Sequence, residues 1–219
     1  MKRIAFYGGS FDPVHDGHLT IARKLSEIFR LDEFVFIPAF HAPHKKDKKP
    51  TSAFHRYAML ALATAAEPQI RISGMEIEAP ERPFTFETLT RLKNELPDAR
   101  IFFVMGADSW QDITTWREWE KVLTLVNIIV VTRPDYEIGF SHVTEEIRQR
   151  IVDWRDGGQQ QDDSRFTIHD SRIFITDAVQ IDISATEIRE KIRDGKGGWQ
   201  EFLPTEVIKY VVKYGLYLK

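Results

Sequence analysis

The fold of this chain is indicated by one stretch, GGSFDPVHDGH at residues 8–18. It follows a short apolar run at 4–7, and apolar side chains recur at helical spacing over 19–29. In an open α/β sheet, such a strand-to-helix turn lies at the carboxyl end of a strand, where ligands bind. Paired glycines let the backbone approach a ligand, and the free N–H groups of the next helix favour an anion. The stretch therefore predicts a phosphate-binding turn.

Two widespread phosphate-binding patterns are missing from this stretch. It has no Gly-Lys-Ser/Thr, so it is not a Walker A loop, and it lacks the Gly-x-Gly-x-x-Gly dinucleotide fingerprint. The plain alternative is a tight turn with two solvent-exposed histidines, His15 and His18. The paired glycines and Pro13 in the same stretch favour phosphate binding over that alternative.

Strand and helix patterns alternate along the rest of the chain. Further strands are predicted at 34–37, 69–78, 101–105, 127–132 and 173–176, of which 69–78 has the pattern of an exposed or edge strand. Helices are predicted at 54–66, 86–96 and 116–125, and from about 185 and about 205. This rhythm predicts an α/β, Rossmann-like fold with a mainly parallel sheet and helices on both faces. We expect one domain over 1–219, with an α/β core at about 1–180 and a small C-terminal helical cap at about 181–219. The polar segment 157–164 is expected to be a surface loop.

Composition limits the classes of function. The 219 residues include 30 basic and 33 acidic side chains, and this balance gives no electrostatic footprint for nucleic-acid binding. The absence of cysteine excludes disulfides and thiolate metal sites. No signal-peptide pattern precedes the first strand, and no apolar run is long enough to span a bilayer. We therefore expect a cytoplasmic protein without nucleic-acid or membrane partners.

Two segments are suited to binding further phosphates. The stretch ISATEIR at 183–189 begins a helix with Ser184 and places Arg189 one turn further in, although Ser184 and Glu187 also fit an ordinary capping box. Lys45, in the basic loop 38–45, could reach over a triphosphate, and the alternative is an ordinary basic loop.

Two other segments are suited to binding the rest of a nucleotide. The turn GADS at 106–109 follows the strand 101–105, so it should face the same crevice, although Asp108 could also cap a short helix. Among Trp110, Trp116 and Trp119, the last two share one face of the predicted helix, and core packing is expected for at least one of them. A tryptophan on the crevice side could stack on a flat heteroaromatic ring.

These motifs resemble those of a known family. Residues 8–18 resemble the nucleotidylyltransferase signature that ends in His-x-Gly-His, and 183–189 resembles its distal partner, Ile-Ser-x-Thr-x-Ile-Arg. The chain is similar to bacterial nicotinate-nucleotide adenylyltransferases in particular, over nearly its whole length except 137–171. The other matching stretches are 43–45, 84–89, 106–109, 115–116 and 131–134.

The resemblance implies a reaction in NAD biosynthesis. Such enzymes join nicotinate mononucleotide to the AMP part of ATP, with Mg²⁺, and give deamido-NAD and pyrophosphate. The implied catalytic residues are His15, His18, Lys45 and Arg189. The implied ATP-binding residues are Gly8, Gly9, Ser10, Phe11, His15, His18, Lys45, Gly106, Asp108, Arg133, Ser184 and Arg189. The implied acceptor-binding residues are His44, Thr85, Trp116 and Arg117. No protein ligand for the metal is assigned, because Mg²⁺ keeps waters and binds through phosphates. Whether the chain forms a homo-oligomer is left open.

Two positions depart from the family pattern. Ala42 stands where members often have the first of two prolines, and Arg117 stands where an aromatic residue is common. An arginine at position 117 could favour the anionic carboxylate of nicotinate.

Three other functions remain compatible with the sequence. Adenylyl transfer to nicotinamide mononucleotide or phosphopantetheine would use the same fold, although phosphopantetheine enzymes are usually shorter and lack the Thr115-Trp116 region. The pairs His15/His18 and His41/His44 have a spacing that could ligate zinc in a hydrolase, but such sites usually have a third protein ligand. A nucleotide sensor without catalysis would not need groups that stabilise a leaving pyrophosphate.

Overall fold

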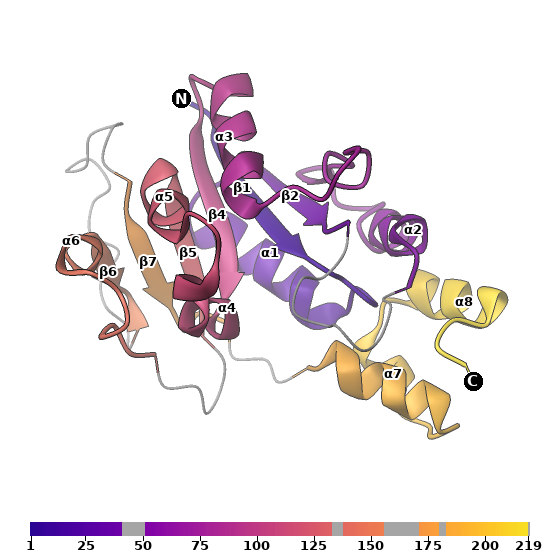
Figure 1. Cartoon of the computed structure of the whole chain (residues 1–219). Helices are drawn as coiled ribbons and strands as arrows, with labels where there is room; N and C mark the ends of the chain where they lie inside the picture. Colours follow the sequence, from indigo (N-terminus) through magenta and orange to yellow (C-terminus); the bar gives the residue numbers. More distant parts are fainter. Residues whose placement is uncertain (41–50, 133–137, 156–170, 180–182, 219) are drawn as a thin grey trace.

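The computed structural model describes residues 1–40, 51–132, 138–155, 171–179 and 183–218 (Figure 1). A seven-stranded sheet runs through the molecule in the order β3-β2-β1-β4-β5-β7-β6, and each neighbouring pair is parallel. The strands are β1 (Arg3–Gly9), β2 (Glu33–Pro38), β3 (Ile70–Ile72), β4 (Arg100–Gly106), β5 (Asn127–Val131), β6 (Ile151–Asp153) and β7 (Ile173–Thr176). The predicted parallel α/β fold is confirmed.

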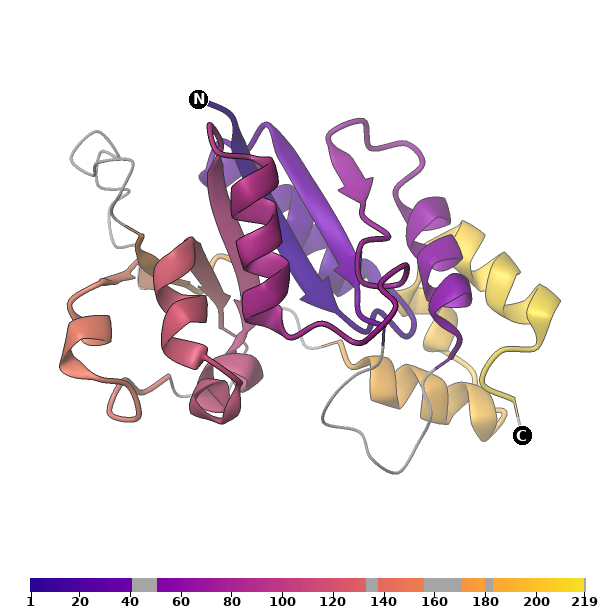
Figure 2. The same ribbon diagram turned by 45° about the horizontal axis from the view of Figure 1, so that its top comes forward.

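Helices cover both faces of this sheet. They are α1 (Asp16–Ile28), α2 (Ala53–Ala63), α3 (Thr85–Glu95), α4 (Ala107–Gln111), α5 (Trp119–Leu125), α6 (Glu145–Arg148), α7 (Ala185–Arg193) and α8 (Thr205–Tyr214), with 3₁₀ turns η1 (Ile113–Thr115) and η4 (Trp199–Phe202). Figure 1 and Figure 2 show α3 on one side of β1 and β4 and α1 on the other. This is the arrangement that the alternating sequence pattern predicts.

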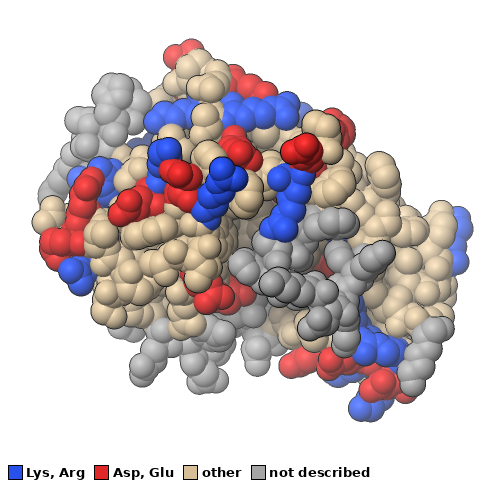
Figure 3. Space-filling model, in the orientation of Figure 1, with Lys and Arg blue, Asp and Glu red and all other residues tan. Residues whose placement is uncertain are grey.

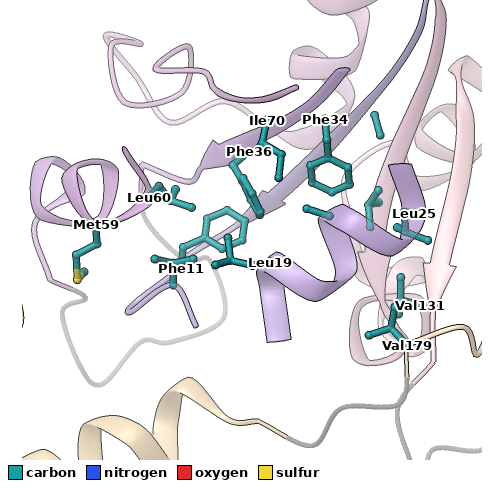
Figure 4. Close-up of a cluster of buried hydrophobic side chains, with 14 of the residues drawn as sticks. Phe11, Leu19, Leu25, Phe34, Phe36, Met59, Leu60, Ile70, Val131 and Val179 are labelled. Atoms are coloured by element: carbon teal, nitrogen blue, oxygen red, sulfur yellow. The ribbon is translucent and has the colours of Figure 1, made fainter. Parts of the chain in front are cut away.

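Two buried clusters, one on each face, hold the layers together. Successive residues of a strand point to opposite faces, so Ala5 joins the cluster under α1 whereas Ile4 and Phe6 join the cluster under α3 and α5. Figure 4 shows the first cluster, in which Phe11 and Leu19 pack beside the strand residues. The apolar runs at 4–7, 34–37, 101–105 and 127–132 are continuous because both faces of these strands are buried.

The C-terminal helices pack onto the same core. Ile188 of α7 and Val207 of α8 are almost fully buried, and both belong to the cluster that also contains Leu19 and Leu25 of α1. The chain therefore has the expected helical cap. Because the cap and the sheet share one buried cluster, we propose that residues 1–219 form one domain, with 181–219 as a subdomain of it.

Two predicted elements differ from the observed ones. The strand predicted at 69–78 lies at the sheet edge as expected, but it spans only Ile70–Ile72, because hydrogen bonds from Met75 N to Ser73 Oγ and from Glu78 N to Gly74 O turn the chain away. The helix predicted at 116–125 begins at Trp119, because Glu118 has a left-handed backbone with φ 54°.

Neither α6 nor β6 was predicted, since four and three residues are too few to show a period. The predicted loop 157–164 lies outside the described residues.

Charged side chains of both signs are mixed on the face shown in Figure 3, as the near-neutral composition leads one to expect. Among the helices of the described ranges, none is long and apolar enough to cross a membrane.

Helix α8 has a valine buried in the core and another that is exposed. Replacing each by alanine should therefore lower the free energy of unfolding by different amounts. Val207 is fully buried, whereas Val212 is 66% exposed. Val207→Ala removes buried methyl groups and leaves a cavity, so it should lower the free energy of unfolding by about 2 kcal/mol. Val212→Ala should change it by less than about 0.5 kcal/mol. Urea unfolding of both variants measures their free energies of unfolding. An equal decrease in the two variants would contradict the described packing of α8.

Candidate active site

The site begins with the glycine-rich turn after β1. Phe11 has a left-handed backbone, with φ 47°, and its buried ring folds back beneath the turn against Phe36, at 5.1 Å between ring centroids. A Cβ on Gly9 would lie 2.8 Å from that ring, so this position accepts only glycine. The glycine at position 9 thus makes room for the ring of Phe11 beside the turn.

Two histidines stand at the start of α1. His15 is the N-terminal capping residue of the helix, and its backbone N–H donates to Nδ1 of His18 at 3.2 Å. The two imidazole rings stack with their centroids 3.7 Å apart. Because Nδ1 of His18 accepts a hydrogen bond, the proton of the neutral ring lies on Nε2, which makes Nε2 a donor. The pair therefore presents polar ring edges at the positive end of a helix of 13 residues.

A second helix start faces this turn. Ser184 caps α7, and its Oγ accepts a hydrogen bond from the backbone N–H of Glu187 at 3.4 Å. The capping box predicted as the plain alternative is thus partly formed, and the hydroxyl proton of Ser184 is still available to donate. Both helix starts point toward one cavity, which suits a ligand with several phosphates.

That cavity has a volume of about 550 Å³ and lies at the carboxyl ends of β1 and β4. From β1 the chain continues to β2 and β3 on one side, and from β4 it continues to β5 on the other, so the connections diverge here and open a crevice. Twelve of the predicted site residues line the cavity: Gly8, Gly9, Ser10, Phe11, His15, His18, Thr85, Gly106, Asp108, Trp116, Arg117 and Ser184.

The turn after β4 also lines the cavity. Asp108 folds back so that its Oδ1 accepts from the N–H of Ser109 at 2.9 Å, and a Cβ on Gly106 would lie 2.6 Å from that oxygen. Glycine at 106 therefore leaves room for the carboxylate. Asp108 lies within the first turn of α4 and lines the cavity, whereas the capping residue of this helix is Gly106, so the predicted alternative of Asp108 as the cap is wrong.

The far end of the cavity is formed by the start of α3 and by the residues after η1. Thr85 is the first residue of α3, and Trp116 follows η1 in an extended conformation rather than in a helix. The guanidinium of Arg117 lies 4.7 Å from the centroid of the Phe84 ring, which is a cation–π contact. Among the described residues, the buried indole N–H of Trp116 has no hydrogen-bond acceptor. This end of the cavity therefore combines a flat ring, a hydroxyl and a cation.

The other two tryptophans have structural roles. Trp110 is fully buried, and its Nε1 donates to the backbone oxygen of Gly139 at 3.0 Å. Trp119 packs against the cluster beneath α5. The prediction that Trp116 and Trp119 share a helix face is wrong, because the left-handed Glu118 separates them. Trp116 is the tryptophan that lines the cavity.

Arg189 occupies a different place from the one expected. Its guanidinium donates to the backbone oxygen of Asp12 at 2.6 Å and to Oγ1 of Thr186 at 3.1 Å, and it does not line the cavity. Arg189 thus supports the glycine-rich turn from behind. Three other predicted residues, His44, Lys45 and Arg133, lie outside the described residues.

Sequence reasoning missed Glu76 and Arg82, which line the cavity beside Thr85. Oε1 of Glu76 accepts from the hydroxyl of Thr88 at 2.9 Å. Burial raises the pKa of Glu76 above its ordinary value, against the smaller opposing effects of Thr88 and Arg82. Glu76 was missed because it fell within the strand predicted over 69–78. Only the observed turn after Ile72 brings it to the cavity.

Within the described ranges, no three His, Asp or Glu side chains are grouped closely enough to hold a metal ion.

Comparison with known proteins assigns the family. The family model described as cytidylyltransferase-like matches residues 6–191. A probable nicotinate-nucleotide adenylyltransferase of Desulfatibacillum aliphaticivorans is 36% identical over 99% of this chain and 100% of its own length. One of Corynebacterium jeikeium is 33% identical over 96% of this chain and 98% of its own.

A solved structure has the same fold. The Plasmodium falciparum nicotinic acid mononucleotide adenylyltransferase, in complex with NaAD, superposes with a TM-score of 0.73 over 99% of this chain and 98% of its own, at 22% identity. Together with the family model and the two relatives, the shared fold leads to one assignment. This chain belongs to the cytidylyltransferase-like family, and within it to the nicotinate-nucleotide adenylyltransferases.

Proposed function

We propose that this protein transfers the adenylyl group of ATP to nicotinate mononucleotide and releases pyrophosphate. The observation that supports this most is the single cavity between two helix starts, with stacked histidines at one end and Thr85, Trp116 and Arg117 at the other. One end suits a triphosphate, and the other suits a flat ring that carries a negative charge. The relatives named as nicotinate-nucleotide adenylyltransferases agree with that pairing.

The chemistry needs positioning more than acid–base catalysis. A phosphate oxygen of the acceptor forms a bond to the α-phosphorus of ATP, while the bond from that phosphorus to the oxygen leading to the β-phosphorus breaks. The electron pair of the broken bond leaves with pyrophosphate, so atoms and charge balance. Because the attacking oxygen is already an anion, no general base is required, and the protein contributes orientation and charge stabilisation.

His18 is the best-oriented donor for the reacting phosphate. The hydrogen bond at its Nδ1 fixes the tautomer that carries a proton on Nε2, and stacking on His15 limits rotation of the ring. A fixed donor costs little reorganisation when charge develops on the α-phosphate oxygens. Ser184 and the free N–H groups at the start of α7 would bind the β- and γ-phosphates. Lys45 completes this proposal as a cation for the leaving pyrophosphate.

Nucleotidyltransferases generally use a divalent metal with ATP, and we propose Mg²⁺ here. Such an ion keeps several waters and binds through phosphates. When bound, it neutralises charge on the phosphates. No residue of this chain is assigned as its ligand.

His18→Ala should lower kcat by roughly a hundredfold or more, the scale for loss of one transition-state donor. The KM values for ATP and for the mononucleotide should change much less. Pyrophosphate release at saturating substrates measures the effect. His142→Ala is the matched control, because that ring bonds the backbone oxygen of Trp110 away from the cavity, and its kcat should stay near wild type. A kcat for His18→Ala within threefold of wild type would contradict the proposed role.

The acceptor end should favour the acid over the amide mononucleotide. The hydroxyl and backbone N–H of Thr85 and the guanidinium of Arg117 are donors, and each hydrogen bond to a charged acceptor contributes about 1.5–3 kcal/mol. Two such bonds give a preference of roughly a hundredfold in kcat/KM, since about 1.4 kcal/mol corresponds to tenfold. The NH₂ group of the amide would face these donors, which opposes its binding.

Three variants test this preference in the same assay. Thr85→Ala and Arg117→Ala should each narrow the ratio of kcat/KM for acid over amide. Lys121→Ala removes a nearby cation that does not line the cavity, so it should leave the ratio unchanged. Equal turnover of the two mononucleotides by the wild type would show that the acceptor was assigned wrongly, while adenylyl transfer itself would stand.

A further inference from the structure

The glycine-rich turn is held from its hidden side by a buried carboxylate. Asp12 is only 5% exposed and does not line the cavity. Its Oδ1 accepts from the hydroxyl of Tyr217 at 2.7 Å, and its Oδ2 accepts from the backbone N–H of Thr51 at 3.1 Å. The side chain of Asp12 thus connects the turn to two distant segments, one of them at the C-terminal end of the chain.

Tyr217 reaches Asp12 because the chain reverses after α8. Gly215 ends the helix in a left-handed conformation, and the N–H of Leu216 returns to the backbone oxygen of Val211 at 3.0 Å. Tyr217 itself has φ 68°, an unfavourable backbone for a residue with a side chain. Burial and the neighbouring Asp12 raise the pKa of Tyr217, so its hydroxyl stays protonated and acts as the donor. A strained backbone is retained here together with the hydrogen bond from the hydroxyl to Asp12, which is shorter than the 4.0 Å contact of the same hydroxyl with Sδ of Met59.

Arg56 makes the surroundings of Asp12 rigid. Its guanidinium is 1% exposed and donates to backbone oxygens of Ser10 at 2.7 Å and of Thr51 at 3.0 Å, and also to that of Ala39. Burial lowers the pKa of Arg56, and the negative charge of Asp12 opposes that effect. The buried guanidinium of Arg56 therefore joins the turn, the end of β2 and the start of α2.

We propose that Tyr217 is a positioning residue for the transfer reaction. By holding the carboxylate of Asp12, it fixes the turn whose open side presents His15 and His18 to the cavity. The inference rests on the proposed function, in which those histidines meet the reacting phosphate. A displacement of about 1 Å in such a group can cost two orders of magnitude in rate.

The geometry separates this role from general stabilisation. The acceptor end of the cavity, at Thr85 and Trp116, belongs to α3 and the residues after η1, and Tyr217 is not among the residues that line it. Loss of the Tyr217 hydroxyl should therefore disturb the phosphate end and leave acceptor binding unchanged. Loss of a residue that only stabilised the fold would not lower kcat while leaving the KM for the acceptor unchanged.

The test compares two tyrosines of the C-terminal region in the full-length protein. Tyr217→Phe removes the hydroxyl that holds Asp12. Tyr210→Phe removes a hydroxyl that bonds Nδ1 of His55 at 2.9 Å, which also joins the C-terminal helix to α2 but does not reach the turn. We expect kcat for pyrophosphate release to fall about tenfold in Tyr217→Phe, with the mononucleotide KM within about twofold of wild type. Tyr210→Phe should keep kcat within about twofold.

A second variant checks that Tyr217 acts through Asp12. Asp12→Asn removes the charge to which Tyr217 donates, and combined with Tyr217→Phe it should lower kcat by less than the product of the two separate effects, since contacting residues are not additive. The inference is wrong if Tyr217→Phe keeps the wild-type kcat, or if kcat falls as far in Tyr210→Phe as in Tyr217→Phe. It is also wrong if kcat of the double variant falls by the full product of the effects of Asp12→Asn and Tyr217→Phe. A wild-type protein that released no pyrophosphate would overturn the proposed function, and the inference with it.

Discussion

The arrangement of this molecule depends on the parallel pairing of β1 between β2 and β4. The chain leaves β1 for β2 and β3 on one side and later continues from β4 to β5 on the other. Helices that follow these strands must cover opposite faces, so the loops after β1 and β4 separate and leave a cavity between them. In Figure 1, the arrowheads of β1 and β4 point toward the side on which α7 lies. The position of the site is therefore a consequence of strand order, before any side chain is considered.

Charge then decides what the cavity can bind. Two helix starts, those of α1 and α7, contribute backbone N–H groups, and the stacked His15 and His18 add donors at the same place. In the turn that carries them, glycine at position 9 makes room for the large buried ring of Phe11. Rigid donors around an anion are the main means of stabilising charge in phosphoryl transfer, and this turn provides them without a Walker A lysine.

Short sequence patterns predicted those parts of the structure that depend on neighbouring residues in the chain. Continuous apolar runs identified the central strands, because these are buried on both faces, and the glycine-histidine stretch identified the turn. The start of α5 at Trp119 and the end of β3 at Ile72 were missed, since each depends on a backbone conformation that no period in the sequence reveals. The contacts of Asp12 with Tyr217 and of Arg189 with the turn join residues more than 170 positions apart.

We propose that both substrates react within this one cavity. The most direct measurement is to incubate the full-length protein with ATP, Mg²⁺ and nicotinate mononucleotide, and to quantify the dinucleotide and pyrophosphate separately. Adenylyl transfer predicts that deamido-NAD and pyrophosphate form in equal amounts and that neither forms without the mononucleotide. Consumption of ATP without a dinucleotide product, or at a rate independent of the mononucleotide, would contradict it.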